Sequence, residues 1–466
     1  MSQETLSQLN ESHVDEISSS RNEPSWLKDY RKNSLSIYST LPIEMSPLYN
    51  KYTDAKRLNP DKISISSSTK QTIPNFLSKR LTELENQICI IQIGTNIHKI
   101  NLPEELKSKG LVISSISDAI QNHSELVKKA LEASKSNEDK FTALNNAAFN
   151  SGIFIHIPKN FTLEQPIHFL SCLSDDGLST ISRNIVFADE NSKASIVQEL
   201  YSPKTENQQA YLELLNTNVA ANAQLDMTTL QMMDQNSINF STRRTDMAQD
   251  SKVNWYSGLF GTVLSRYKID YYLNGSGASS NESEVVFGNN DQHFDIQTNM
   301  NHESPNTEGR VVEKSILRNR SKSLFKGMIR IKENATKSNS FLSGRSILLD
   351  KNAKSDAIPG LEILTNDVKA THSASVAQID EEQIFYLKSR CLSQEEAERT
   401  IVEGFLEPLS RKMSFQVRAW IAYLIESKWE NRELSINTDE ELAKFIEVEE
   451  TRYNEDAEIE QHYKYR

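Results

Sequence analysis

The stretch NIVFADENSKASIVQEL, residues 184–200, contains two short apolar runs joined by a polar turn from Asn191 to Ala194. Short apolar runs of the same kind recur from Gly152 onward: GIFIHIP, PIHFL, QLDMTTLQ, KVNWYSGLF, KIDYYL, EVVFG, GMIRI, SILLD and LEIL. The polar turn also recurs, at Asn222–Ala223, Asp250 to Val253, Gly277–Ala278, Asn334–Ala335, Asn352–Ala353 and Asp367–Val368. Many short strands without intervening helices are typical of a sandwich, a barrel or a solenoid.

The spacing of these turns decides little by itself, because it drifts between about 15 and 30 residues and makes a degenerate repeat. One turn chemistry kept over roughly 200 residues favours a solenoid, in which each rung stacks only on its neighbours. From this pattern a parallel β-helix and a β-sandwich both remain open.

The bulk composition restricts the class of protein. The chain has 466 residues and a formal net charge of −12, from 64 acidic and 52 basic residues. Nucleic-acid surfaces need clustered Lys and Arg, so the charge argues against a nucleic-acid partner. No stretch approaches the roughly 20 apolar residues that cross a bilayer, and the polar N-terminus resembles no secretory or transit signal. We therefore expect a cytoplasmic protein with no membrane partner.

The pattern of apolar and charged residues divides the chain into five segments. Residues 1–22 lack periodic apolar positions, which predicts a disordered N-terminus. Residues 23–150 predict a mixed, mainly helical region, and residues 151–375 hold the strands. Helical periodicity returns in residues 376–436, while residues 437–466 are charged and predict a solvated tail.

Helix signals are clearest after the strands. Ser393 and Glu396 form a capping box, in which side chains satisfy the free N–H groups of a helix over residues 393–409. A further helix is predicted over residues 414–430, and Thr438 with Glu441 is predicted to cap a last one.

Cysteine and glycine patterns exclude several chemistries. Cys89, Cys172 and Cys391 are far apart, whereas a self-contained zinc or iron–sulfur site needs closely spaced thiolates. Cys89 and Cys172 lie in apolar runs and predict core residues, while Cys391 follows a helix end that favours the left-handed conformation. No GxxxxGK[ST] motif occurs, so we expect no ATP site, and the GSG turn at Gly275 to Gly277 is too short for a dinucleotide site.

Two polar groups could carry chemistry. Gln292, His293, Asp295 and His302 are the densest cluster and suggest a metal site, although stacked polar ladders are commoner in solenoids. Four carboxylates invite comparison with carbohydrate-active β-helix enzymes, but their spacing supports no catalytic pair. These are Glu303, Glu308, Asp350 and Asp356.

Several long motifs resemble the SufB/SufD family of the SUF iron–sulfur cluster assembly system. They run in order from EPSWLKDYR at residue 23 through FTALNNAAFNSGIFIHIPKN at residue 141 and QHFDIQTNMNHESPNTEGRVVEKSILRNRSKSLFKGMIRI at residue 292. The last are SDAIPGLEI, DVKATHSASVAQIDEEQIFYLKSR and LSQEEAERTIVEGFLEPL, which together reach from Ser355 to Leu409. The resemblance implies a mainly β protein, with a right-handed parallel β-helix core between N-terminal and C-terminal α-helical regions.

Single positions within these motifs imply a SufD-like chain. SufB-like chains carry a cysteine where Ala353 stands and a glutamate where Ser373 stands. The SufD family histidine matches His372, which the resemblance implies could hold iron or a nascent cluster together with a partner subunit. A thiolate is the soft ligand that such clusters need, and Ala353 cannot supply one. The competing interpretation of His372 is a histidine that satisfies backbone groups at the end of the β-helix.

The resemblance also implies partners and a role. It implies a scaffold without enzymatic activity that pairs with a SufB-like subunit, β-helix to β-helix, and docks the SufC ATPase through exposed residues of the helices at 393–409 and 414–430. A transient iron–sulfur cluster or iron at the partner interface, and reduced flavin in the complex, are further expectations. Two alternatives stay open: a SufB-like chain without the cluster cysteine acting as a homodimer, and an unrelated carbohydrate-active β-helix enzyme.

Overall fold

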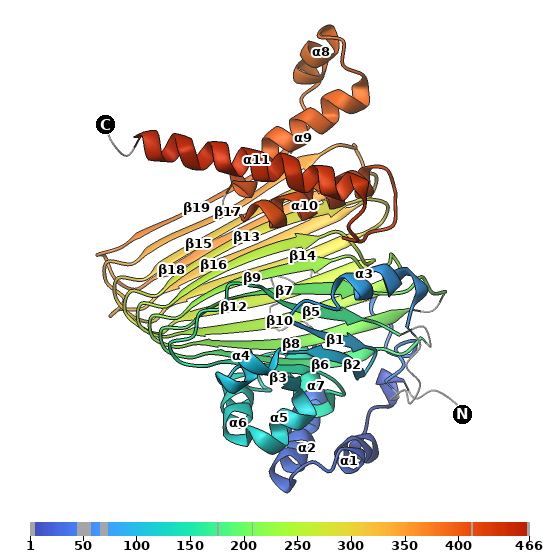
Figure 1. Cartoon of the computed structure of the whole chain (residues 1–466), viewed down its shortest axis with the longest axis vertical. Helices are drawn as coiled ribbons and strands as arrows, with labels where there is room; N and C mark the ends of the chain where they lie inside the picture. Colours follow the sequence, from blue (N-terminus) through green and yellow to red (C-terminus); the bar gives the residue numbers. More distant parts are fainter. Residues whose placement is uncertain are drawn as a thin grey trace.

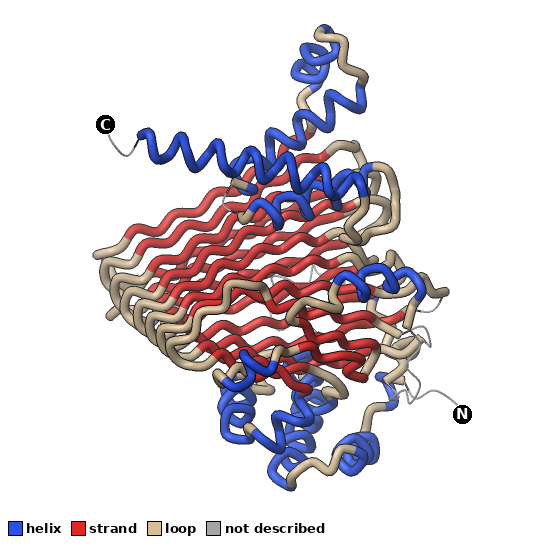
Figure 2. The backbone as a smooth tube through the Cα atoms, viewed as in Figure 1, coloured by secondary structure: helices blue, strands red, loops and turns tan. Residues whose placement is uncertain are grey.

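A computed structural model describes residues 5–43, 57–65, 73–174, 177–206, 208–411 and 413–463. Two long β-sheets lie face to face and form a flattened coil, with helices gathered at both ends (Figure 1, Figure 2). The first sheet has ten strands in the order β19-β17-β15-β13-β11-β9-β7-β5-β1-β2, and the second has nine in the order β18-β16-β14-β12-β10-β8-β6-β4-β3.

The strand bounds are as follows. The first sheet contains β1 Cys89–Ile93, β2 Asn96–Asn101, β5 Ile167–Cys172, β7 Lys193–Tyr201, β9 Gln224–Gln231, β11 Lys252–Leu259, β13 Ser279–Gly288, β15 Glu308–Leu317, β17 Asn339–Leu348 and β19 Lys369–Gln378. The second sheet contains β3 Val112–Ser115, β4 Ile153–Ile157, β6 Thr180–Ala188, β8 Gln209–Val219, β10 Ser237–Met247, β12 Leu264–Leu273, β14 His293–His302, β16 Lys322–Ile331 and β18 Lys354–Ile363.

Strands two apart in sequence pair in parallel, and this confirms the parallel β-helix and rejects the sandwich. Leu264 of β12 pairs with His293 of β14, and Lys322 of β16 pairs with Lys354 of β18. One rung therefore consists of two strands, one from each sheet. The irregular spacing in the sequence arises because each apolar run is a strand, which is half of the structural repeat.

The turns between the second sheet and the first stack into a ladder. Asn191, Asn222, Asp250 and Asn306 all have φ between 53° and 58°. In each turn the backbone N–H of this residue donates to a carbonyl of the next rung, as Asn191 does to Ala221 at 3.0 Å. Asn and Asp tolerate the left-handed conformation better than other side chains, so the repeated turn residues in the sequence have a direct structural cause.

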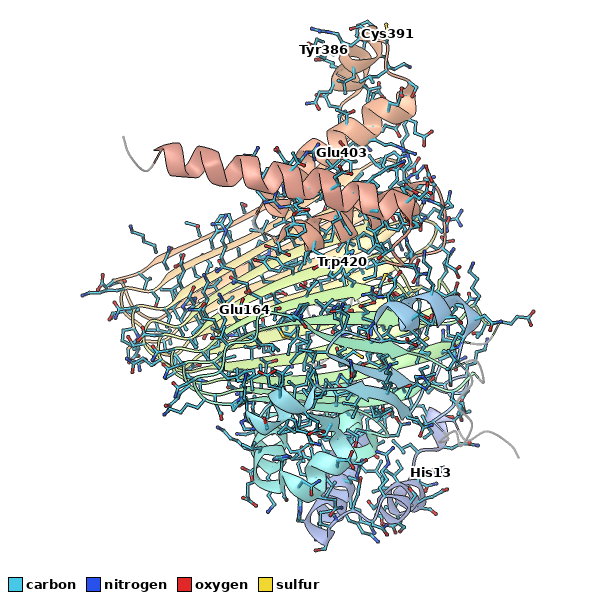
Figure 3. The ribbon with its side chains drawn as sticks, viewed as in Figure 1. His13, Glu164, Tyr386, Cys391, Glu403 and Trp420 are labelled. Carbon is cyan, nitrogen blue, oxygen red and sulfur yellow. The ribbon has the colours of Figure 1, made fainter. Side chains whose placement is uncertain are left out.

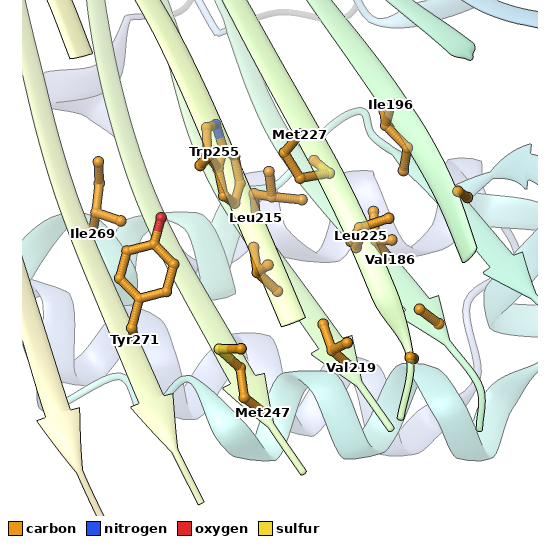
Figure 4. Packing of buried hydrophobic residues seen from close by; sticks show 14 of the residues in the cluster. Val186, Ile196, Leu215, Val219, Leu225, Met227, Met247, Trp255, Ile269 and Tyr271 are labelled. Carbon is orange, nitrogen blue, oxygen red and sulfur yellow. The ribbon is translucent and has the colours of Figure 1, made fainter. Parts of the chain in front are cut away.

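The core lies between the two sheets and runs along the coil (Figure 4). Val186, Leu215, Trp255 and Ile269 belong to one continuous buried cluster. Strands such as β6 are buried along their whole length, because helix α7 (Lys140–Ala148) covers their outer face. Strands buried on both faces lose the apolar–polar alternation of half-exposed strands.

The N-terminal region corrects one expectation. Residues 1–22 were expected to be disordered, yet Leu6–Gln8 form the 3₁₀ helix η1 and Glu11–Ser20 form α1. Val14 and Leu6 are buried against the same cluster as α2 (Ser25–Thr40), which supplies the apolar contacts that the short sequence window did not reveal. The Ser-rich composition of residues 60–73 predicts a linker, and this stretch lies partly outside the described residues.

The remaining elements of this region are short. They are η4 (Asn75–Leu77), α3 (Ser78–Glu83), α4 (Glu104–Ser108), α5 (Ile116–Asn122) and α6 (Ser124–Ala133). The strands β1, β2 and β3 lie in the same region and form the first edges of the two sheets; β2 and β3 run antiparallel to their neighbours.

The C-terminal region contains α8 (Glu381–Ser389), α9 (Gln394–Ser410), α10 (Phe415–Trp429) and α11 (Glu440–Tyr463). The predicted capping box of Ser393 and Glu396 is confirmed. The predicted cap at Thr438 is wrong, since the Asp439 carboxylate accepts the N–H of Leu442 at 2.8 Å. The segment expected to be a solvated tail forms α11, and Leu442 is fully buried against the neighbouring helices.

Helix α10 differs most from its expected role. It was predicted to carry exposed docking residues, but Val417, Trp420, Leu424 and Trp429 are buried. Figure 3 shows Trp420 between the solenoid and α11. A helix that is apolar on all sides is enclosed. Throughout the described ranges, every helix is too short or too polar to cross a membrane.

Candidate functional site

The last rung of the solenoid, formed by β18 and β19, is open. Each strand pairs on one side only within the described chain, β18 with β16 and β19 with β17. Most of its residues are exposed or half-buried, in contrast to the buried rungs before it. We call these two strands the open rung. A strand edge with free N–H and C=O groups is a template for pairing with another strand.

The apolar core continues into the open rung. Leu361 stands in register on Ile329, and Ile363 on Ile331. Ile329 and Ile331 are buried, whereas Leu361 and Ile363 are 38% and 39% exposed. Leu364 and Val376 add further exposed apolar surface. Such surface at the end of a core marks a place where another protein packs.

His372 lies on β19 within this open rung. It pairs in register with Leu342 of β17, a core residue, so its side chain stands on the inner face of the coil. Its side chain is exposed, and its neighbours on the same face are the small residues Ala370 and Ala374. The imidazole is therefore accessible from the end of the solenoid.

Ala353 lies at the turn that leads into β18 and is nearly buried. Its N–H donates to the carbonyl of Asp350 at 3.1 Å. The position therefore belongs to the same rung as His372 but offers no thiolate. Cys89 on β1 and Cys172 on β5 are buried, as predicted.

Comparison with known proteins agrees with this architecture. The description "SUF system FeS cluster assembly, SufBD core domain" matches residues 171–405, and "SufBD protein N-terminal region" matches residues 3–169. The chain belongs to the SufBD family. Its members assemble iron–sulfur clusters in the SUF system, and the core match runs from the end of β5 to Phe405 in α9.

Curated SufBD relatives cover nearly the whole chain. An iron–sulfur cluster assembly SufBD family protein of Staphylococcus aureus strain USA300 is 28% identical over 443 residues, which covers 91% of this chain and 93% of the relative. A protein of the same description from Staphylococcus haemolyticus is 27% identical over 438 residues, with 91% and 93% covered. The resemblance seen in the motifs is thereby confirmed at the level of the family.

The predicted polar cluster does not form a metal site in this SufBD chain. His302 lies on β14 with His293 and Asp295 but at a position of opposite parity, so it faces the interior while they face outward. The Asp295 carboxylate pairs with the Lys326 ammonium at 2.7 Å. Within the described ranges no three His, Cys, Asp or Glu residues are arranged to hold a metal ion.

Each member of that cluster has a structural partner instead. His302 Nδ1 lies 2.8 Å from the Thr307 hydroxyl, and burial lowers the pKa of its imidazole to about 4. Gln292 donates to the Thr262 carbonyl at 2.7 Å and accepts from Lys428 of α10 at 2.5 Å. Gln292 therefore helps attach the C-terminal helices to the solenoid, whereas His302 and Asp295 bind partners within the solenoid.

The scattered carboxylates behave as turn residues. Glu303 pairs with Lys332, Asp350 accepts the N–H of Asn319 at 2.6 Å, and Asp356 pairs with Lys354 at 3.0 Å. Glu308 is exposed at the start of β15. The turn at Gly275 to Gly277 stacks on the preceding turn, where a Cβ on Gly277 would lie 2.1 Å from an Asp250 oxygen. The close stacking of the two turns therefore accounts for the glycine at position 277.

Helices α8 and the first half of α9 form an arm that projects away from the solenoid (Figure 3). Phe385 and Tyr386 of α8 are 75% and 56% exposed, and Arg390 stacks over the Tyr386 ring. Cys391 is exposed with φ of 69°, as predicted for a residue that ends a helix in the left-handed region. Below the arm, a cavity of about 690 Å³ lies between α9, α10 and α11.

Two further buried groups were not predicted from the sequence. The Arg80 guanidinium of α3 binds the buried Glu199 carboxylate of β7 at 2.6 Å, and three carboxyl groups lie buried on the inner face of β13 and β15. Glu199 lies in the run SIVQEL, and Glu282 and Glu284 alternate with Ser283 and Val285, so each of these glutamates resembles an outward-facing residue in the sequence. Only the strand register shows which way each side chain points.

Proposed function

We propose that this chain is a SufD-type scaffold subunit without catalytic activity of its own, working in the cytoplasm on iron–sulfur cluster assembly. It pairs with a SufB-like subunit through the open rung and docks the SufC ATPase on the arm of α8 and α9. The observation that carries the proposal is the exposed end of the core, where Leu361 and Ile363 lack the next rung. The alanine at position 353 supports the SufD-type assignment, because the sulfur ligand then comes from the partner.

His372 is the one chemical contribution proposed for this chain. An exposed neutral imidazole at the pairing edge can bind iron or a nascent cluster, which is the cargo of the assembly. Reduced flavin in the complex remains a prediction that we attach to no residue.

The docking of SufC is proposed on α8 and α9 alone, because α10 is enclosed. The exposed aromatic rings of Phe385 and Tyr386 support this choice, since aromatic residues are enriched at the centres of protein interfaces. An arm that projects from the solenoid can transmit the movement of an ATPase to the rung beside it.

Co-purification of the full chain with SufB-like and SufC subunits tests the proposal. Ile363→Glu should release the SufB-like subunit and keep SufC, because a charge replaces the end of the core. Ile100→Glu is the matched control: Ile100 has the same 39% exposure but lies on β2 at the opposite end of the solenoid. Phe385→Asp should release SufC only. If the three-subunit complex still forms with the Ile363→Glu variant, the proposal that the open rung is the pairing surface is wrong.

A second candidate uses the same surface. The open rung could pair with the open rung of another copy, as in a SufB-like homodimer without the cluster cysteine. Light scattering on the isolated chain distinguishes the two: a stable dimer that Ile363→Glu dissociates, and that does not exchange with a SufB-like subunit, favours the homodimer.

A further inference from the structure

Three carboxyl groups form a buried patch inside the solenoid. Glu282 and Glu284 alternate on β13, so both side chains point to its inner face. Glu313 of β15 pairs in register with Glu284, which places it one strand away on the same face. All three are at most 1% exposed. We call Glu282, Glu284 and Glu313 the carboxyl patch.

The patch has few hydrogen-bond donors. Neither oxygen of Glu282 or of Glu284 has a partner in hydrogen-bonding geometry among the described residues, and the same holds for Oε2 of Glu313. The other oxygen of Glu313 accepts from the Ser315 hydroxyl. An ionised carboxylate buried without donors or a cation is strongly disfavoured.

The cation that acts on the patch is Arg243, whose Nε and Nη2 are engaged elsewhere, while its Nη1 has no hydrogen-bond partner among the described residues. Arg243 of β10 donates to Gln198 and to Ser241, both at 3.1 Å, and its guanidinium lies 3.7 Å from the Glu213 carboxylate of β8. Glu213 in turn accepts from Gln198 at 2.5 Å and from Asn184 at 2.7 Å. One arginine therefore faces four interior carboxyl groups, and Glu213 is the one of the four that accepts the most hydrogen bonds.

The surroundings favour the neutral acid at each member of the patch. Burial, followed by the charge of Glu284, raises the pKa of Glu282 well above its usual value. Burial raises the pKa of Glu284 to about 7, although Arg243 opposes the shift. Burial also raises the pKa of Glu313 to about 8, against the Ser315 hydroxyl and the N–H of Arg345 on β17.

The other groups that face the patch add no positive charge. The Thr298 hydroxyl of β14 approaches Glu282, and the phenol of Tyr271 on β12 lies near both Glu282 and Glu284, whose charges, after burial, raise its pKa. A metal ion is not the missing partner, because the described residues contain no set of ligands suited to one. The patch is neutralised by protons.

We propose that the carboxyl patch is a proton-dependent lock on the middle rungs: the native solenoid keeps these carboxyl groups protonated, and the rungs from β11 to β17 open when base removes the protons. Rung separation is the expected response, since like charges on adjacent strands repel and can regain water only if the sheets part. The inference concerns the folded chain alone and does not depend on its partners.

The sign of the pH dependence follows from the direction of the shifts. An unfolded glutamate has a pKa near 4.5, whereas Glu284 and Glu313 in the folded chain have pKa values of about 7 and about 8. The folded state therefore holds more protons within this window. The stabilisation by the patch is complete below the unfolded pKa and is lost as the pH rises through the folded values.

Urea unfolding of the full chain between about pH 5 and about pH 9 tests the lock. For each proton that the folded state holds and the unfolded state does not, the unfolding equilibrium constant increases by up to about tenfold when the pH rises by one unit. Glu284→Gln and Glu313→Gln should each flatten the wild-type decline, and the triple glutamine variant should remove most of it. Glu308→Gln, at the exposed start of β15, is the matched control and should leave the profile unchanged.

A second measurement needs no variant that might fail to fold. The infrared spectrum of the folded wild-type chain near neutral pH should contain the carbonyl stretch of protonated carboxyl groups shielded from solvent, and this band should vanish as the solenoid opens in base. Wild-type and glutamine variants with parallel pH profiles would overturn the proposal. So would a native spectrum at about pH 6 without the protonated carboxyl band.

Discussion

The Lys428 ammonium of α10 donates to Oε1 of Gln292 at 2.5 Å, across the junction between the C-terminal helices and the solenoid. The same ammonium donates to the Phe260 carbonyl. Neither partner carries a negative charge, and Lys428 is nearly inaccessible to water. Burial lowers the pKa of this lysine to about 7.

Lys428→Met should therefore stabilise the chain most below pH 7. The pKa of the folded lysine lies below its unfolded value of 10.5, so Lys428 makes the folded chain bind fewer protons, and its own contribution to stability rises with pH between these values. The slope of this contribution is at most about 1.4 kcal/mol per pH unit. Urea unfolding at several pH values above 7 should therefore show the stability difference between the variant and the wild type shrink with this slope, because other groups that titrate in this range act equally on both chains. Equal slopes in both chains would contradict the assignment.

Glu199→Gln should destabilise the attachment of α3 to the solenoid. Burial alone would raise the pKa of Glu199, but the Arg80 guanidinium and the His168 ring hold it at about 2. Removing one charge of a buried pair costs about 3–5 kcal/mol. The difference from wild type should be full above about pH 4.5 and shrink as the pH falls toward 2, which acid titration followed by circular dichroism can measure.

Gly404→Ala should stabilise α9. Gly404 lies inside this helix, and a Cβ there would meet no atom within 4 Å. Alanine in a helix interior is favoured over glycine by about 1 kcal/mol. Gly152→Ala provides the contrast: this glycine has φ of +145° and a Cβ would lie 1.8 Å from the Arg183 carbonyl oxygen. Thermal unfolding should move in opposite directions for the two variants.

His372→Ala should slow the maturation of client iron–sulfur proteins without changing the assembly of subunits. The side chain is exposed on the open rung, so its removal leaves no cavity. His98→Ala, on β2 at the opposite end, is the matched control. Client enzyme activity in cells and the size of the purified complex measure the two effects separately. Full maturation by the His372 variant would assign this histidine to structure alone.

The sequence predicted those features of the fold that depend on the local conformational preference of a single residue type. The turn at Asn222 repeats because its left-handed backbone strains most other side chains. The residues around Ser393 predicted the start of α9 because a capping box is a local device. The direction of a side chain and the enclosure of a helix could not be predicted in this way. His302 and His293 lie on one strand yet face opposite sides, and α10 was expected to keep an exposed face although most of its residues are buried.

The candidate site was predicted in part. The motif around His372 placed this residue near the end of the strands, and the structure adds that β19 is the last strand of its sheet. The carboxyl patch escaped notice because Glu282 and Glu284 alternate with Ser283 and Val285, which is the pattern of a half-exposed strand. Burial on the inner face is set by the register with Trp255, and that register is a property of the assembled coil.

The two ends of the coil are not complementary in shape. At the start, the free edges are β2, a strand of 6 residues, and β3, a strand of 4 residues, and both run antiparallel to their neighbours. At the finish, β18 and β19 offer 10 residues each in parallel register. We therefore expect head-to-tail stacking, the route by which like subunits grow into filaments, to be disfavoured. Association through β18 and β19 would then occupy that end and stop at a pair.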